Sequence, residues 1–266
     1  GAGGQLGQML YKHWPIKGQL RAQSRQNIDG MLRFDPLDAP KDLRAAGLGV
    51  RAVICLSGVT PAHAAKSGDA MQLNTELALA AIEAAPIDAR VFVISSAAVY
   101  GAADGPHSEG VQTCPVSDYG RAKREMEHAA LALGDGRVCV LRIGNVAGAD
   151  AILGGWREGM TLDTFADGRT PRRSYIGPKS LARVIHTLCM SEAVPDVINI
   201  AAPGVVSMGD LLNEAGCGWS GRAANSSAIE EVELDTARLE ALYVFEPEEC
   251  TARGIVAQLN DEDFTE

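Results

Sequence analysis

A serine, a tyrosine and a lysine in the middle of the chain have types and spacing suited to proton transfer. Ser96 ends the apolar run Val91–Ser96, and Tyr119-Gly120-Arg121-Ala122-Lys123 begins 23 residues after it. In a helix, a spacing of four residues puts Tyr119 and Lys123 on one face. A nearby ammonium favours the phenolate, so Tyr119 could exchange a proton near neutral pH while Ser96 holds a hydroxyl or carbonyl oxygen.

The chain opens on a glycine pattern that suits an anion. Gly1, Gly4 and Gly7 lie in GAGGQLG, and a helix is expected from there to Trp14-Pro15. A backbone without Cβ atoms can approach a pyrophosphate closely, and the free N–H groups of the following helix face it. The pattern predicts a dinucleotide site, whose nicotinamide C4 would take or give hydride beside Ser96 and Tyr119.

The residues that follow the next strand bear on the choice of cofactor. They read Ala22-Gln23-Ser24-Arg25, and the next acid is Asp29. A hydroxyl and a guanidinium suit a ribose 2′-phosphate, whereas an acid would suit a 2′-hydroxyl. NADP is therefore favoured, with NAD as the alternative.

Strands and helices alternate along the first two thirds of the chain. The expected helices are Met71–Ala85 and Ser117–Leu133, the second with a Ser-Asp start. The expected strands are Leu20–Ser24, Leu32–Phe34, Ala52–Ser57, Val91–Ser96, Val138–Ile143 and Val197–Ile200. This alternation predicts an α/β fold with a doubly wound parallel sheet. Beyond about residue 148, Gly, Pro and charged residues predict a small α/β lobe over the carboxyl edge of the sheet.

Composition excludes several classes of function. Lys and Arg number 24 and Asp and Glu 34, a net charge of −10 that disfavours nucleic-acid and acidic-membrane partners. Apolar runs long enough to span a bilayer are missing from the sequence, which is expected to act in the cytoplasm. The six cysteines and five histidines show no metal-ligand spacing, so no metal is expected.

Taken together, these motifs resemble the extended short-chain dehydrogenase/reductases, the NAD(P)-dependent epimerase/dehydratase family whose best-known members act on nucleotide sugars. GAGGQLG is similar to the family's GxxGxxG, Ser95–Gly101 to its SSxxVYG, and Tyr119–Lys123 to its YxxxK. The resemblance implies a Rossmann domain over residues 1–147. Residues 148–266 would form mainly the substrate lobe, with elements that return to the Rossmann domain.

The resemblance also implies roles for individual residues. Ser96, Tyr119 and Lys123 would be catalytic, and Ser96, Asn145 and Arg173 would bind substrate, the arginine through a nucleotide diphosphate. The cofactor contacts would be Gly1, Gly4, Gln5, Leu6, Gly7, Ser24, Arg25, Asp35, Leu56, Ser57, Gly58, Asn74, Tyr119 and Lys123. Asn74 has an alternative role, to tie the cofactor loop together without touching ligand. Many relatives dimerise through the helices around YxxxK, so a homodimer is implied.

Departures from the family pattern reduce the number of activities expected of this protein. Ala97 and Ala98 stand where 4,6-dehydratases carry Asp-Glu, which argues against that elimination chemistry. Reductase and epimerase both remain open, and NADP use would favour a reductase. A reductase of a non-sugar ketone and a non-catalytic NAD(P)-binding sensor are the alternatives, although a sensor has no need of the Ser96, Tyr119 and Lys123 set.

One expectation concerns the strand that normally delivers the chain to a phosphate-binding loop. Nothing precedes Gly1 in the sequence, and a parallel sheet without its middle strand would leave its neighbours unpaired. We therefore expect a natural chain longer by about five to ten apolar residues. Direct pairing of Leu20–Ser24 with Ala52–Ser57 would overturn this expectation.

Overall fold

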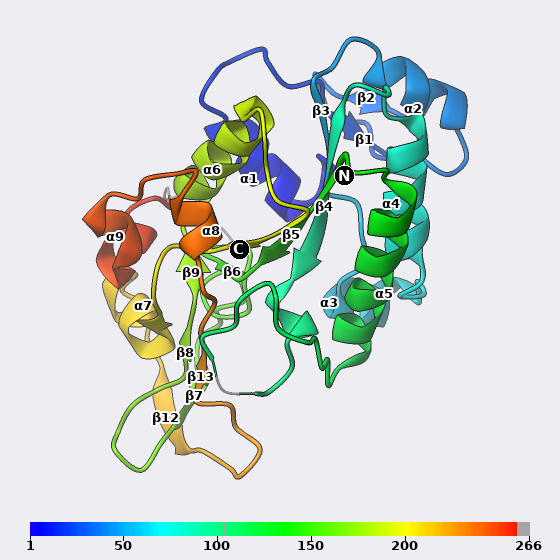
Figure 1. Cartoon of the computed structure of the whole chain (residues 1–266). Coiled ribbons are helices and arrows are strands. Elements are labelled where there is room, and N and C mark those ends of the chain that lie inside the picture. The colour runs from blue at the N-terminus through cyan, green and yellow to red at the C-terminus, as the bar shows by residue number, and fades with distance from the viewer. Residues whose placement is uncertain (104, 260–266) are drawn as a thin grey trace.

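A parallel β-sheet lies at the centre of the protein (Figure 1). The computed structural model describes residues 1–103 and 105–259. Within this part of the chain, four strands follow one another in the order β10-β5-β4-β3. Their bounds are β3 Ala52–Cys55, β4 Arg90–Ser96, β5 Val138–Ile143 and β10 Val197–Ile200. All neighbouring pairs are parallel, and Ser96 at the end of β4 lies opposite Ile143 at the end of β5.

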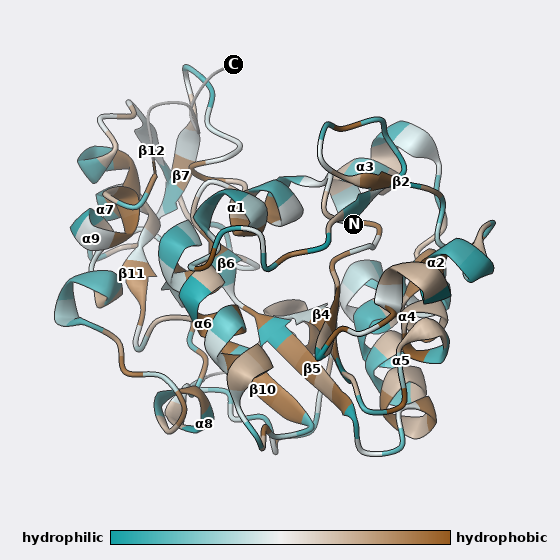
Figure 2. Cartoon of the chain, turned by 90° about the horizontal axis from the view of Figure 1, so that it is seen from above, coloured by the Kyte–Doolittle hydropathy of each residue, from teal (hydrophilic) through white to brown (hydrophobic). Residues whose placement is uncertain are grey.

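The central strands form because their side chains are apolar on both faces. All six residues of β5 are buried, and Figure 2 shows apolar colour along β4, β5 and β10. Phe92 packs with the cluster on one face of the sheet, whereas Val91 and Val93 pack with the cluster on the other. Strands buried on both faces are typical of parallel sheets.

Helices cover both faces. On one side lie α1 (Gln5–His13) and α6 (Pro178–Met190), and on the other α4 (Leu73–Ala84) and α5 (Asp118–Leu133). Shorter helices α2 (Pro40–Gly47) and α3 (Pro61–Ser67) precede and follow β3 in the chain. Both α6 and β10 come after residue 148, so the chain does return to the sheet. The domain boundary itself stays a prediction.

The remaining elements build a second lobe after β5. Its parallel pairs are β6 (Asn145–Val146) with β9 (Tyr175–Ile176) and β7 (Thr161–Thr164) with β12 (Ser220–Ala223). The other elements are β8 (Arg172–Arg173), β11 (Val206–Ser207), β13 (Glu231–Val232), α7 (Met208–Glu214), α8 (Ala237–Glu240), α9 (Ala252–Val256) and the 3₁₀ turn η2 (Pro247–Cys250). A further 3₁₀ turn, η1 (Ala97–Val99), directly follows β4. Residues from α7 and α9 pack with Tyr175 and Leu162 in a separate apolar cluster. The expected α/β sheet with a smaller lobe is confirmed.

The two strands that precede β3 in the chain are each only two residues long. Of the expected Leu20–Ser24 only Gln23–Ser24 forms β1, which pairs with β2 (Leu32–Arg33) rather than with β3. A cavity of about 690 Å³ lies between them, lined by residues of β1, β3, α1, α4 and α6. The direct pairing that would overturn the expected extra strand is therefore not observed. Leu20–Ala22, Phe34 and Leu56–Ser57, expected as strand, lie outside regular structure.

Two further properties follow from the described residues. None of the helices in this part of the chain is long and apolar enough to cross a membrane. Among the same residues, no cluster of His, Cys, Asp or Glu side chains could hold a metal ion.

The cavity predicts an asymmetry between two alanines. Ala81 of α4 lines the cavity, whereas Ala130 of α5 is fully buried among Val138 and Met126. Overpacking a filled core costs about 1–3 kcal/mol. We expect Ala130→Leu to lower the free energy of unfolding by that amount and Ala81→Leu to lower it by less than about 0.5 kcal/mol, as measured by urea denaturation. Equal losses would show that the space between β1 and β3 is filled in solution.

Candidate active site

The ends of β4 and α5 bring Ser96 and Tyr119 together. The Ser117 hydroxyl accepts a hydrogen bond from Gly120 N (3.1 Å) and so begins α5 immediately before Tyr119. The Ser96 hydroxyl caps η1 by accepting from Ala98 N (3.2 Å), which holds it at the carboxyl edge of the sheet. The Ser96 hydroxyl also acts on the Tyr119 phenol, whose pKa it lowers. The two side chains can therefore act on one oxygen atom.

The acidity of Tyr119 differs from the expectation. Burial raises the pKa of Tyr119 above its usual value, and the interaction with Ser96 opposes this only in part. Lys123 lies 5.8 Å from the ring centroid, but its charge does not overcome the loss of solvent around the phenol. Without the nicotinamide cation, which was expected to act together with the ammonium, burial is the larger influence on the pKa of Tyr119.

Lys123 is held by the backbone of the neighbouring strand. Its Nζ donates to Ile94 O (2.8 Å) and contacts Met126 Sδ (3.9 Å), and only 5% of the residue is exposed. Burial lowers the pKa of Lys123 to about 8, while Cys55 and Glu127 favour the ammonium form. A lysine of this kind is protonated at pH 7 and changes charge close to it.

The glycine loop has the shape of a phosphate cradle. A Cβ on Gly7 would lie 2.5 Å from Ala2 Cα, and a Cβ on Gly1 would lie 2.6 Å from Leu56 C, so both glycines allow close backbone packing. At Gly4, the N-cap of α1, the nearest atom would be 3.5 Å away, and no side chain caps the helix. The open, uncapped helix start fits a dinucleotide pyrophosphate.

The segment after β3 joins the glycine loop to the lysine. Gly1 packs against Leu56 and Ser57, and a Cβ on the next residue, Gly58, would lie 3.3 Å from Lys123 Nζ. These neighbours place the expected cofactor residues on a continuous path from α1 to α5. Gln5, also expected there, donates instead to Gly148 O (2.6 Å), which connects α1 to the second lobe. Leu6 packs against the main core cluster.

Asn74 is fully buried and bonded to backbone. Its Oδ1 accepts from Val59 N (3.1 Å), and its Nδ2 donates to Val59 O (3.1 Å) and Met71 O (3.0 Å). These contacts brace the loop that contains Ser57 and Gly58. They fit the alternative role considered for this residue, a tie within the cofactor loop.

The residues expected around the adenosine ribose lie at the exposed edge of the sheet. Ser24 is buried and its hydroxyl accepts from Gln26 N (3.0 Å), whereas the Arg25 side chain is 64% exposed. Arg25 Nη1 lies 3.7 Å from Asp35 Oδ2. The arginine expected to favour a 2′-phosphate thus has a carboxylate beside it.

Two of the three expected substrate residues lie on different strands of the second lobe, Asn145 on β6 and Arg173 on β8. Asn145 pairs with Tyr175 across β6 and β9, two residues beyond Ile143. Arg173 donates to the carbonyls of Arg172 (2.7 Å), Ile229 (2.9 Å) and Glu230 (3.2 Å). Burial lowers the pKa of Arg173, a sign that its charge is incompletely solvated.

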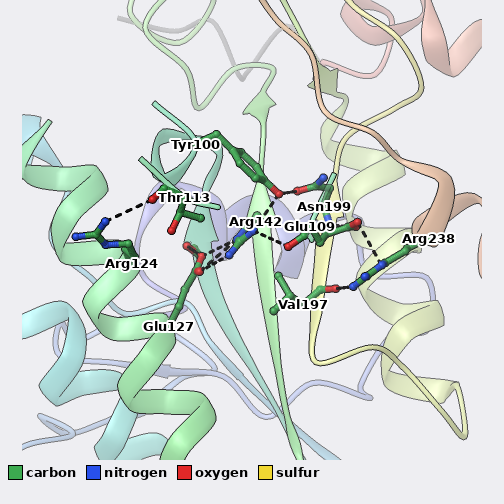
Figure 3. A network of polar contacts seen from close by, with 10 residues as sticks. Tyr100, Glu109, Thr113, Arg124, Glu127, Arg142, Val197, Asn199 and Arg238 are labelled. Atoms are coloured by element: carbon green, nitrogen blue, oxygen red, sulfur yellow. Dashed lines mark hydrogen bonds and ion pairs between the residues drawn. The ribbon is translucent and has the colours of Figure 1, made fainter. Parts of the chain in front are cut away.

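A buried ion pair next to this site was not anticipated from the sequence (Figure 3). Arg142 Nη2 of β5 lies 2.7 Å from Glu127 Oε2 of α5, and Glu127 also accepts from Ser95 Oγ (2.5 Å). Two signals could have revealed it. Arg142 interrupts the apolar strand Val138–Ile143, and Glu127 lies one helical turn beyond Lys123 on the same face.

Comparison with known proteins agrees with this arrangement. The model of a family described as the NAD dependent epimerase/dehydratase family matches residues 1–201. A search of curated protein sequences finds no match.

Several solved structures share the fold. An NAD dependent NDP-hexosamine 5,6-dehydratase, TunA, involved in tunicamycin biosynthesis, is 19% identical, with a TM-score of 0.73 over 96% of this chain and 93% of that one. MoeE5 in complex with UDP-glucose and NAD is 23% identical, with a TM-score of 0.72 over 97% and 95%. A short-chain dehydrogenase/reductase superfamily protein from Agrobacterium tumefaciens with bound NAD is 17% identical, with a TM-score of 0.75 over 97% and 94%.

The contacts of Asn74 predict a mainly structural effect of its loss. We expect Asn74→Ala to lower the free energy of unfolding by about 1–3 kcal/mol, because the buried N–H and C=O of Val59 lose their partner. Glu76→Ala, on the exposed side of the same helix, is the control and should change it by less than about 0.5 kcal/mol. Urea denaturation measures both. A loss of NAD affinity with unchanged stability would instead make Asn74 a direct cofactor ligand.

Proposed function

Since the chain belongs to the NAD dependent epimerase/dehydratase family, we propose that it is an enzyme that transfers hydride at a carbinol or keto carbon of a nucleotide sugar. The observation that carries this proposal is the meeting of Ser96, Tyr119 and Lys123 beside the glycine loop. A serine hydroxyl and a phenol that lie close together can hold one substrate oxygen between them. The path through Ser57 and Gly58 supports a cofactor that reaches from α1 to this pair.

The proposed chemistry assigns one task to each side chain. In alcohol oxidation, Ser96 accepts or donates a hydrogen bond to the substrate hydroxyl, and Tyr119 accepts its proton. In ketone reduction, Tyr119 returns that proton to the oxygen. NAD, when bound, supplies the hydride acceptor or donor at its nicotinamide ring.

Lys123 supports proton transfer through its charge. An ammonium near the phenol stabilises the phenolate relative to the phenol, and the pKa of about 8 keeps the lysine protonated at pH 7. The bond to Ile94 O holds the ammonium at the end of β4, next to the residues that bind substrate. A positive nicotinamide ring would favour the phenolate further, in opposition to the burial that raises the pKa of Tyr119.

The substrate class follows from the second lobe. Arg173 is half-buried and, with three of its donors on backbone carbonyls, has its guanidinium held in place. We propose that its remaining donors bind a diphosphate and that Asn145 binds the sugar. Structural neighbours bound to UDP-glucose or UDP-glucuronic acid support this class. Ala97 and Ala98 still argue against a 4,6-dehydratase, so epimerase and reductase are the two forms proposed.

For the cofactor we propose NAD. Three of the structural neighbours depend on NAD or have it bound. The NADP preference expected from Ser24 and Arg25 therefore receives no support. The 3.7 Å approach of Asp35 to Arg25 gives a physical reason. A 2′-phosphate at Arg25 would also meet this carboxylate, which repels it.

Removal of the phenolic hydroxyl tests the reaction. Parent and Tyr119→Phe proteins would be assayed with NAD and UDP-glucose, UDP-glucuronic acid or dTDP-glucose, and products followed by NMR. We expect kcat to fall by about 10²- to 10⁴-fold, because the proton carrier is lost. Tyr243→Phe, between α8 and η2, is the matched control and should keep the parent rate. A Tyr119→Phe protein as active as the parent would refute the mechanism.

The cofactor choice predicts how the ribose site responds to mutation. Calorimetry should find NAD bound at least about tenfold more tightly than NADP, a difference of about 1.4 kcal/mol. Arg25→Ala should leave the Kd for NAD within about twofold, since an exposed ion pair contributes little. Tighter NADP binding that Arg25→Ala abolishes would restore the expectation drawn from Ser24 and Arg25.

A further inference from the structure

Glu127 links the helix of the catalytic lysine to two strands. Only 1% of this residue is exposed, and its carboxylate accepts from Ser95 Oγ (2.5 Å), Arg142 Nε (3.0 and 3.2 Å) and Arg142 Nη2 (2.7 Å). Ser95 directly precedes Ser96, and Glu127 lies one turn after Lys123. Glu127 therefore bonds to Ser95 of β4, next to Ser96, and to Arg142 of β5. Its own helix, α5, contains Lys123.

Arg142 extends the connection to the segment after β4 (Figure 3). Its Nη1 donates to Tyr100 Oη (3.1 Å) and to Glu109 O (3.3 Å), and the guanidinium stands 5.0 Å from the Tyr100 ring centroid. Tyr100 follows η1, which Ser96 caps. The guanidinium is thus engaged by Tyr100 and Glu109, which lie on the segment that runs from Ser96 to Tyr119.

We infer that Glu127, held in place by Arg142, is a positioning residue that keeps Lys123 charged and in register with Ser96. The inference rests on the proposed function, in which Lys123 acts as an ammonium. Two neighbouring bonds, from Lys123 to Ile94 O and from Ser95 to Glu127, hold α5 against the end of β4. Slippage of the helix along the strand would break both bonds at once.

The charges around Lys123 explain why Glu127 is needed. From β3, the thiol of Cys55 interacts electrostatically with the lysine. From α5 itself come Tyr119 and Glu127, and from β5 comes Arg142, which is bound to Glu127. Burial raises the pKa of Cys55, so its thiol is neutral at pH 7 and the carboxylate of Glu127 is the anion that favours the ammonium.

A second buried carboxylate in the same network provides a matched control. Glu109 Oε1 accepts from Asn199 N (2.8 Å), and Glu109 Oε2 lies 3.3 Å from Arg238 Nε. Glu109 stands on the segment between η1 and α5 and does not contribute to the pKa of Lys123. Loss of its charge disturbs a buried ion pair without a direct effect on the lysine.

The test is an NMR titration of Lys123 that needs neither cofactor nor substrate. The chain has only six lysines, so ¹³Cε-labelled protein gives few signals, and Lys123→Met assigns the one of interest. In the parent the signal should titrate at about 8. In Glu127→Gln, which keeps the shape of the side chain, the midpoint should fall by about one pH unit or more because the favourable charge is gone. In Glu109→Gln it should stay within about 0.3 unit of the parent.

A double variant separates this role from simple stabilisation. Glu127→Gln with Arg142→Met removes both buried charges, so it should recover Tm relative to Glu127→Gln alone while the Lys123 midpoint stays low. A parent-like midpoint in Glu127→Gln, or equal shifts in Glu127→Gln and Glu109→Gln, would overturn the inference. If Tyr119→Phe is fully active, the proposed function fails, whatever the lysine titration shows.

Discussion

The buried ammonium of Lys123 is the constraint on which the rest of the site depends. A charged group taken out of water is unfavourable unless hydrogen bonds and an opposite charge replace the solvent. The structure supplies Ile94 O at 2.8 Å and the Glu127 carboxylate, and a pKa of about 8 shows that they compensate burial only in part. Ile94 O and the Glu127 carboxylate have fixed positions. The ammonium that they stabilise therefore fixes the position of α5 along β4, and so the position of Tyr119 relative to Ser96.

The site also requires close backbone packing, which glycine residues allow at both ends of the path from α1 to α5. Gly1 packs on Leu56 and Ser57, and Gly58 packs on Asn74 and Lys123, where Cβ atoms would collide with backbone or amide oxygen. Asn74 then holds the intervening loop through Val59. The uncapped start of α1 and the lysine are thereby brought to one edge of the sheet, as a single extended cofactor requires.

Elements with strong local signals could be predicted from the sequence. The strand Val138–Ile143 has the expected bounds, and α5 begins one residue after its expected Ser117 cap. Leu20–Ser24 is mostly irregular because a strand also needs a partner, and a cavity lies on its inner side. The ion pair of Glu127 with Arg142 depends on sheet register, and the raised pKa of Tyr119 depends on burial. Neither register nor burial is visible in local sequence.

A crystal structure with NAD bound tests most directly whether the glycine loop and the Ser96, Tyr119 and Lys123 set form one site. The account predicts the pyrophosphate at the N-terminus of α1, over Gly4, and the nicotinamide ring beside Ser96 and Tyr119. A dinucleotide bound elsewhere, or one whose nicotinamide ring lies out of reach of the Tyr119 hydroxyl, would contradict it.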